Sequence, residues 1–406
     1  MVSAMPLYAS FDHFPAEVTL EILYQLSDLE TLDSIVRASP NAWRVFSQYG
    51  VDIMERVLDS GYIHKHSRVM VRIIAAIRMN SFPIDNVEDL KRRVTAAAIL
   101  HPAAKYDPSR NAFEPSTFPA TSTCEMMRGI LLTARRISFL TCNCLDFYLQ
   151  KFRQCDPQIP ADPDYSIGLK DGTGCEWLHL QRFLYPEMIS FPVEDMGKPV
   201  WSEEQIISRA FWRIQLVKDL ERALKNRTIT DWPLSEIHKL NSLDIVEIYD
   251  FEEIGWLVAT VDFEFRHLSA SQPGDEYTTE HSAVMAALEY MARHDAPNPP
   301  RWWSRSWPLP AMLPRDIEQA GTDSDVLDVS QSCGRRSYSN IFQTCHTSAP
   351  SVVLYRRLGF FIWSEERLNA HGFGRRFGSH LGRYSMLTWL SIVPEAYTLK
   401  LESIGV

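Results

Sequence analysis

The residues of this 406-residue chain that could bind a metal or act as nucleophiles are chiefly its cysteines. Cys142 and Cys144 form a Cys-x-Cys pair, but the apolar periodicity around them predicts a helix. Residues two apart on a helix point about 200° from each other, so the two thiols cannot face one ion. We interpret both as core or surface thiols. The seven cysteines are irregularly spaced, which is typical of reduced thiols in an intracellular protein.

A second set of possible metal ligands lies toward the C-terminal end. Cys333, Cys345 and His346 could converge with His371, but their spacing matches no common zinc pattern. The two histidines that flank Lys65 are expected to be exposed to solvent. The sequence therefore predicts neither a metal centre nor a bound cofactor.

Sequence motifs of the common enzyme classes are missing as well. The chain has no Gly-x-x-x-x-Gly-Lys-Ser/Thr loop, no His-Glu-x-x-His, no Gly-x-Ser-x-Gly and no Rossmann-type glycine run. Residues 372–378, GFGRRFG, are rich in glycine, but they lack the preceding strand and the glycine order of a phosphate-binding loop. We interpret them as a turn, and we predict that the protein is not an enzyme.

Charge is distributed unevenly along the chain, and a basic segment of this kind could bind an acidic partner. Residues 333–390 contain eight Arg, no Lys and two Glu, whereas residues 243–280 contain ten acids and one Arg. Either the arginines pair with acids inside the protein, or their planar guanidinium groups bind a carboxylate or phosphate of another molecule. The candidates for binding an acidic or phosphorylated substrate are Arg356, Arg357, Arg375 and Arg376.

A proline-rich segment offers a second candidate contact surface. Residues 295–314 carry six prolines together with Trp302, Trp303 and Trp307. One interpretation is an ordered strap whose indoles pack on the helical core. The other is an aromatic surface for a protein substrate, because tryptophan is enriched at interface hot spots.

The net charge and the lengths of the apolar runs limit which classes of partner the protein can bind. A net charge of -10 argues against non-specific binding to nucleic acid, which depends on Lys and Arg displacing counterions. No apolar run approaches the ~20 residues of a membrane span, and the first residues do not form a signal peptide. We therefore expect a cytoplasmic or nuclear protein that contacts neither a membrane nor nucleic acid.

Helical periodicity dominates the chain, so the predicted fold class is predominantly all-α. A capping box, Ser202 with Gln205, introduces an expected helix at 203–225. Long proline-rich connections separate the helices. The other expected helices span residues 67–79, 87–100, 125–152, 242–258 and 279–293.

The first 60 residues hold three short helices in quick succession. Ser27 and Glu30 form a capping box for the second helix, and Pro40 suits the first turn of a third. Helices this short present more apolar faces than one small core can bury. Some of that surface must therefore meet the rest of the chain or another protein.

The order of these residues resembles an F-box. Phe14-Pro15 stands where that family usually has Leu-Pro, and Trp43 matches its late tryptophan. The resemblance implies a three-helix F-box at 11–55 that binds a Skp-type adaptor and, through it, a cullin-RING ubiquitin ligase. The adaptor contacts that it implies are Phe14, Pro15, Val18, Ile22, Leu23, Leu26, Leu29, Leu32 and Val36.

A second resemblance lies near the other end. YRRLGFFIWSEERL, residues 355–368, is similar to a segment that closes many uncharacterised F-box-like proteins of filamentous fungi. Gly359 can end a helix in the left-handed conformation, and Ser364 can cap the next helix. We interpret this segment as a structural corner, and the resemblance brings no known activity with it.

Together these resemblances imply two domains, the F-box at 11–55 and a large irregular helical domain at 60–406 that binds an unknown protein substrate. The implied function is substrate recognition in a Skp-cullin-F-box ubiquitin ligase. Two alternatives stay open. In the first, the N-terminal helices serve an interaction outside ubiquitination or only clamp the fold. In the second, the protein is a helical enzyme of unrecognised type.

Overall fold

The computed structural model describes ten stretches of the chain, and these contain eight helices and two strands. The described residues are 13–81, 117–161, 187–228, 279–294, 298–300, 303–311, 358–360, 362–373, 388 and 391–392. The elements are α1 (Ala16–Tyr24), α2 (Leu29–Ala38), α3 (Pro40–Leu58), α4 (Lys65–Arg78), α6 (Cys124–Arg153), β1 (Gln158–Pro160), β2 (Met188–Ser190), α8 (Trp201–Lys225), α12 (Thr279–His294) and α17 (Glu365–Ala370).

The predominantly all-α fold class is confirmed, because helices make up most of the described residues. The helices expected at 67–79, 125–152, 203–225 and 279–293 are present with ends that differ by a few residues. Those expected at 87–100 and 242–258 lie outside the described residues.

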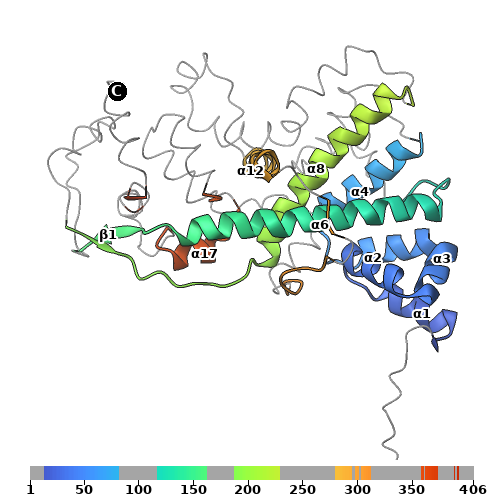
Figure 1. The fold of residues 1–406 in the computed structure, drawn as a ribbon, viewed down its shortest axis with the longest axis horizontal. Helices are drawn as coiled ribbons and strands as arrows, with labels where there is room; N and C mark the ends of the chain where they lie inside the picture. Colours follow the sequence, from blue (N-terminus) through green and yellow to red (C-terminus); the bar gives the residue numbers. More distant parts are fainter. Residues whose placement is uncertain are drawn as a thin grey trace, which may run out of the picture.

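Helix α6 is the long central element on which the others pack (Figure 1). Thr123 caps its start, since the Thr123 hydroxyl accepts a hydrogen bond from the backbone N–H of Met126 at 3.2 Å. Its buried positions recur along one broad side from Met127 to Phe152 of this thirty-residue helix. Helices α2 and α3 pack on α6, and α8 and α12 pack on it as well.

Helix α8 begins before Ser202, so the predicted capping box of Ser202 with Gln205 was wrong. The Glu203 carboxylate accepts from the backbone N–H of Val200 at 3.0 Å, so the helix begins at Trp201. The Gln205 side chain instead accepts from the backbone N–H of His64 at 3.1 Å. His64 was expected to be exposed, but it is buried beside Trp201, because α4 packs on α8 at this point.

The strands form a small antiparallel hairpin beyond the C-terminal end of α6. Ile159 of β1 is paired with Ile189 of β2. The extended chain after β2 leads to α8 and is joined to α17 by a hydrogen bond from the Glu194 N–H to the Ala370 carbonyl at 3.0 Å. The hairpin thus lies at one end of the molecule and the N-terminal helices lie at the other (Figure 1).

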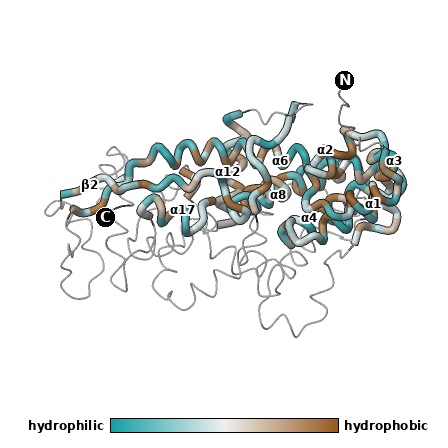
Figure 2. The backbone as a smooth tube through the Cα atoms, turned by 90° about the horizontal axis from the view of Figure 1, so that it is seen from below, coloured by the Kyte–Doolittle hydropathy of each residue, from teal (hydrophilic) through white to brown (hydrophobic). Residues whose placement is uncertain are grey.

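One hydrophobic core joins all of these helices. It extends from Leu23 in α1, through α6 and α8, to Phe373 after α17. Brown apolar stretches alternate with teal polar ones along the helices in Figure 2, as expected for amphipathic elements. The N-terminal helices therefore share their core with the rest of the chain.

Candidate docking surface on the N-terminal helices

The start of α1 is fixed by two hydrogen bonds from α3. The Asn41 side-chain amide donates to the Phe14 carbonyl at 2.9 Å and to the Thr19 hydroxyl at 2.8 Å. Asn41 and Thr19 are both buried. This arrangement aligns α1 with α3 and fixes which side of α1 faces the interior.

A neighbouring side of α1, about 100° around the helix from the buried Thr19 and Leu23, carries a partly exposed apolar stripe. Val18 is 43% exposed, and Phe14, Ile22 and Leu26 are half-buried. Val18 and Ile22 are spaced four apart within α1, which extends from Ala16 to Tyr24, so they lie along one side of this helix. Phe14 precedes the helix, and Leu26 follows it and packs partly against the core. Pro15 is exposed as well. We call Phe14, Pro15, Val18, Ile22 and Leu26 the α1 stripe.

The remaining predicted adaptor contacts lie inside the protein. Leu23 is fully buried, and Leu29, Leu32 and Val36 of α2 are at most 5% exposed. Helix α2 is enclosed because it packs against both α3 and α6. These four residues hold the N-terminal helices together, while the α1 stripe remains open.

Helix α2 is capped by Asp28, and the predicted capping box of Ser27 with Glu30 was wrong. The Asp28 carboxylate accepts from the Thr31 N–H at 2.8 Å. Ser27 instead uses its carbonyl to accept from the Ser60 hydroxyl at 3.0 Å. The Glu30 side chain bonds to Ser138 of α6 rather than to the start of its own helix.

Glu30 belongs to a buried charged cluster that ties α2 to the rest of the chain. Its carboxylate accepts from the Ser138 hydroxyl of α6 and lies 3.2 Å from the guanidinium of Arg305. Arg305 also bonds Glu204 of α8. Burial raises the pKa of both Glu30 and Glu204, and Arg305 offsets this only in part. Four segments, α2, α6, α8 and the segment that contains Arg305, thus meet at one charged cluster.

A second cluster reinforces the same interface. Asp33 of α2 lies 3.4 Å from Arg37 and 3.6 Å from Arg135 of α6, and burial raises its pKa. Arg135 also donates to the Pro300 carbonyl at 2.6 Å. The position of α2 relative to α6 is therefore held by charges as well as by apolar packing.

The described part of the tryptophan segment forms the strap that was predicted as one alternative. Trp307 is 3% exposed, and Trp303 makes an edge-to-face contact with Phe139 of α6, with ring centroids 5.2 Å apart. The Pro310 carbonyl accepts from the Tyr62 hydroxyl at 3.2 Å. Trp302 lies outside the described residues.

The C-terminal corner has the predicted local geometry. Gly359 has a φ of 77°, and the Ser364 hydroxyl caps α17 by accepting from the backbone N–H of Arg367 at 3.3 Å. Arg367 is fully buried and pairs with Glu203 of α8 at 2.9 Å. This arginine of the basic segment therefore pairs inside the protein. The candidates Arg356, Arg357, Arg375 and Arg376 lie outside the described residues.

The described metal-ligand candidates are buried and do not gather into a site. Cys142 and Cys144 are both buried, and burial raises the pKa of each thiol. The His371 ring packs against the Phe152 ring at a tilt, with ring centroids 4.2 Å apart, and burial lowers the pKa of His371. Within the described stretches no group of three or more potential ligands is close enough to hold an ion. Cys333, Cys345 and His346 lie outside those stretches.

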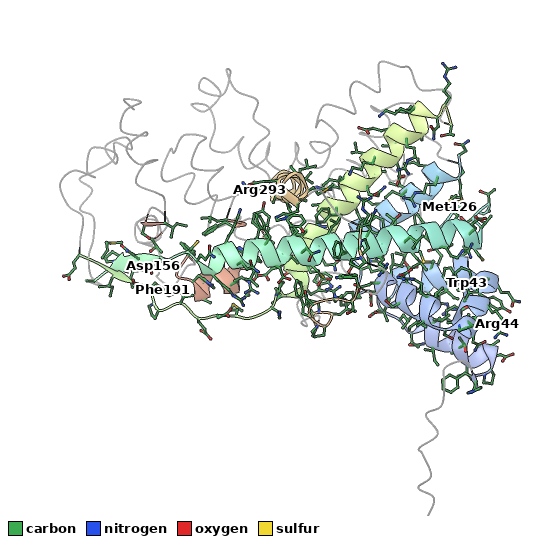
Figure 3. All side chains as sticks on the ribbon, in the orientation of Figure 1. Trp43, Arg44, Met126, Asp156, Phe191 and Arg293 are labelled. Atoms are coloured by element: carbon green, nitrogen blue, oxygen red, sulfur yellow. The ribbon has the colours of Figure 1, made fainter. Side chains whose placement is uncertain are left out.

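Sequence reasoning did not predict the exposure of Trp43 in α3. Trp43 is 41% exposed, and the Arg128 guanidinium of α6 lies 4.3 Å from its ring centroid. Figure 3 shows Trp43 at the same end of the molecule as Met126 of α6. The spacing of apolar residues alone does not distinguish an inward from an outward tryptophan at this position.

Comparison with protein-family models, curated proteins and solved structures finds no match for this chain. Among the helices that the structure describes, none is long and apolar enough to cross a membrane.

Proposed function

We propose that the chain is the substrate-recognition subunit of a Skp-cullin-F-box ubiquitin ligase and that the α1 stripe is its contact with a Skp-type adaptor. The observation that carries the proposal is the combination of an F-box-like residue order with an outward apolar stripe on α1. Isolated exposed apolar residues need no explanation, but Val18 and Ile22 share one side of α1 and are flanked by Phe14, Pro15 and Leu26. A grouped apolar surface of this kind suits a helix that docks in a groove.

The buried positions of the same motif support this division of roles. Leu23, Leu29, Leu32 and Val36 build the internal core, and the charged clusters at Glu30 and Asp33 fix α2 on α6. Helix α2 therefore acts as an internal clamp. Helix α1 is then presented on a rigid base, which lowers the conformational entropy lost on binding.

The protein would contribute proximity and no bond chemistry. A substrate held by the remaining chain would be brought to the ubiquitin donor at a high effective concentration. In this proposal a rigid link between the adaptor-binding helices and the rest of the chain has a clear use, because it fixes the distance and direction between substrate and ligase.

The test replaces one exposed valine of the stripe with a charge and compares it with a matched valine elsewhere. Val18 is 43% exposed and Val193, in the extended chain after β2, is 41% exposed. The full-length wild type, Val18→Asp and Val193→Asp are purified and titrated with a Skp-type adaptor by calorimetry. We expect Val18→Asp to weaken binding by about 10-fold or more, in line with the roughly 1.5–3 kcal/mol of one buried aliphatic side chain, and Val193→Asp to bind as wild type.

Equal thermal unfolding of the two variants serves as the control for folding. Adaptor binding that is unchanged in Val18→Asp and in Ile22→Asp would contradict the proposal. Affinity purification with proteasome activity blocked then separates the two outcomes for ubiquitination, since recovery of cullin with the adaptor supports the ligase and recovery of adaptor alone supports a role outside ubiquitination.

A further inference from the structure

The outward face of α6 carries a regular row of two arginines with a leucine between them. Arg128, Leu132 and Arg136 are spaced four residues apart, so each is turned about 40° from the one before and all three lie on one broad side of the helix. Leu132 is 58% exposed, the largest exposure of any large apolar side chain in the described residues. We call Arg128, Leu132 and Arg136 the α6 row.

The two arginines of the α6 row have no carboxylate partner in the part of the chain that the structure describes. Arg128 stacks on Trp43 with its guanidinium 4.3 Å from the ring centroid. Arg136 lies near Lys218 of α8, and its Nε is buried without a hydrogen-bond acceptor among the described residues. The neighbouring Arg135 is paired, in contrast, with Asp33.

The neighbours of the α6 row increase its positive charge. Burial and the adjacent Arg136 lower the pKa of Lys218, because two cations close together disfavour each other's charged form, and the nearby Glu221 offsets this only in part. Asp219 is already shared between Arg78 and Arg222. An anion bound at the row would therefore relieve a repulsion that the described residues leave in place.

The stacked arginine is also suitably oriented to bind an anion. Stacking uses the face of the guanidinium group, which leaves the N–H groups at its edge free to donate. A carboxylate accepts two such hydrogen bonds at once. Trp43 thus holds the Arg128 side chain in place and reduces the side-chain entropy lost when it binds.

The distance between Arg128 and Arg136 along α6 indicates how far apart two acidic groups of a ligand should be. Arg128 and Arg136 are eight residues apart, so their positions are separated by about 12 Å along the helix axis at about 1.5 Å per residue. In an extended peptide, residues one, three and five face the same side, and the first and fifth are separated by about 13 Å at about 3.3 Å per residue. An acidic residue at each end would meet an arginine, and the middle residue would meet Leu132.

We propose that the α6 row binds an extended acidic peptide of the pattern acid-x-apolar-x-acid from a protein partner. The inference deepens the proposed function and rests on it for one step only, namely that the partner is the ubiquitination substrate. The protein as a whole carries a charge of -10, so an acidic peptide is repelled by most of the chain and is attracted locally to this face.

The chain itself contains the same pattern at residues 85–89, DNVED, outside the described residues. The experiment therefore includes Asp85→Asn/Asp89→Asn, so that occupation by this segment is distinguished from binding of a partner.

The experiment measures fluorescence anisotropy of a labelled peptide, Gly-Ser-Asp-Thr-Leu-Thr-Asp-Ser-Gly, titrated with the full chain at low ionic strength. One control peptide has Asn in place of both Asp, and another has two extra Thr before the second Asp. We expect saturable binding of the first peptide only, and a loss of about tenfold in affinity for Arg136→Glu, where one exposed attraction becomes a repulsion. A peptide with Lys in place of one Asp should recover binding to Arg136→Glu.

Three results would overturn the inference. The first is the absence of saturable peptide binding to the wild type, and the second is equal binding of the Asn peptide. The third is peptide binding that appears only in Asp85→Asn/Asp89→Asn, which would mean that the chain's own segment occupies the α6 row. The adaptor titration of Arg136→Glu separates this inference from the proposed function. Normal adaptor binding with lost peptide binding supports a second surface, whereas wild-type peptide binding with no adaptor binding would contradict only the proposed function.

Discussion

Gly359 shows how one backbone position fixes the corner where the C-terminal segment meets α6. Its φ of 77° lies in the left-handed region, where a side chain is strained, and a Cβ at this position would lie 2.9 Å from the Cβ of Tyr148. The chain turns here so that Phe360 and Trp363 reach Phe152 at the end of α6. The conformation was predictable from the sequence, but the close approach to Tyr148 was not, because Tyr148 lies on a helix far away along the chain.

Replacing this glycine should cost more than strain alone. Gly61 has a φ of 87° and open space around its Cα, so Gly61→Ala measures the strain without a clash. We expect Gly61→Ala to lower the free energy of unfolding by roughly 1–2 kcal/mol, and Gly359→Ala to lower it by about 1–3 kcal/mol more. Urea unfolding of both variants is the measurement, and equal losses would show that Tyr148 does not restrict the corner.

Among the elements, the strap at 303–311 and helix α2 depend on each other. Arg305 is the only described residue that bonds both Glu30 of α2 and Glu204 of α8. The sequence predicted the long helices well, because their periodicity is local. It misplaced the cap of α2, because Ser27 and Asp28 are both good caps and the choice follows from Glu30 being drawn to an arginine 275 residues away.

Removing this arginine should be far more costly than removing an exposed one. Arg305→Ala leaves two buried carboxylates without their cation, and we expect it to lower the free energy of unfolding by about 3–5 kcal/mol. Arg293→Ala breaks the largely exposed pair with Glu289 on α12 and should cost less than about 1 kcal/mol. Thermal and urea unfolding compare the two, and a small loss for Arg305→Ala would mean that this arginine is not needed to hold α2 in place.

Across the whole molecule, the N-terminal helices divide their apolar residues between the inside and the outside. Val18, Ile22 and Leu23 are of one chemical type and nearly adjacent, yet Leu23 is fully buried and Val18 is open to solvent. The sequence could identify the set but not the division, because the division depends on where α3 and α6 pack. The open residues lie on α1 or directly next to it in the chain, and the enclosed ones lie mainly on α2.

Hydrogen–deuterium exchange of the full chain, measured with and without a Skp-type adaptor, tests directly whether α1 is the docking helix. We predict slower exchange in peptides covering residues 14–26, little change in residues 29–36, which are already enclosed, and no change in residues 187–196. Slowing that is confined to other parts of the chain, with residues 14–26 unchanged at saturating adaptor, would contradict the assignment of α1 as the docking helix.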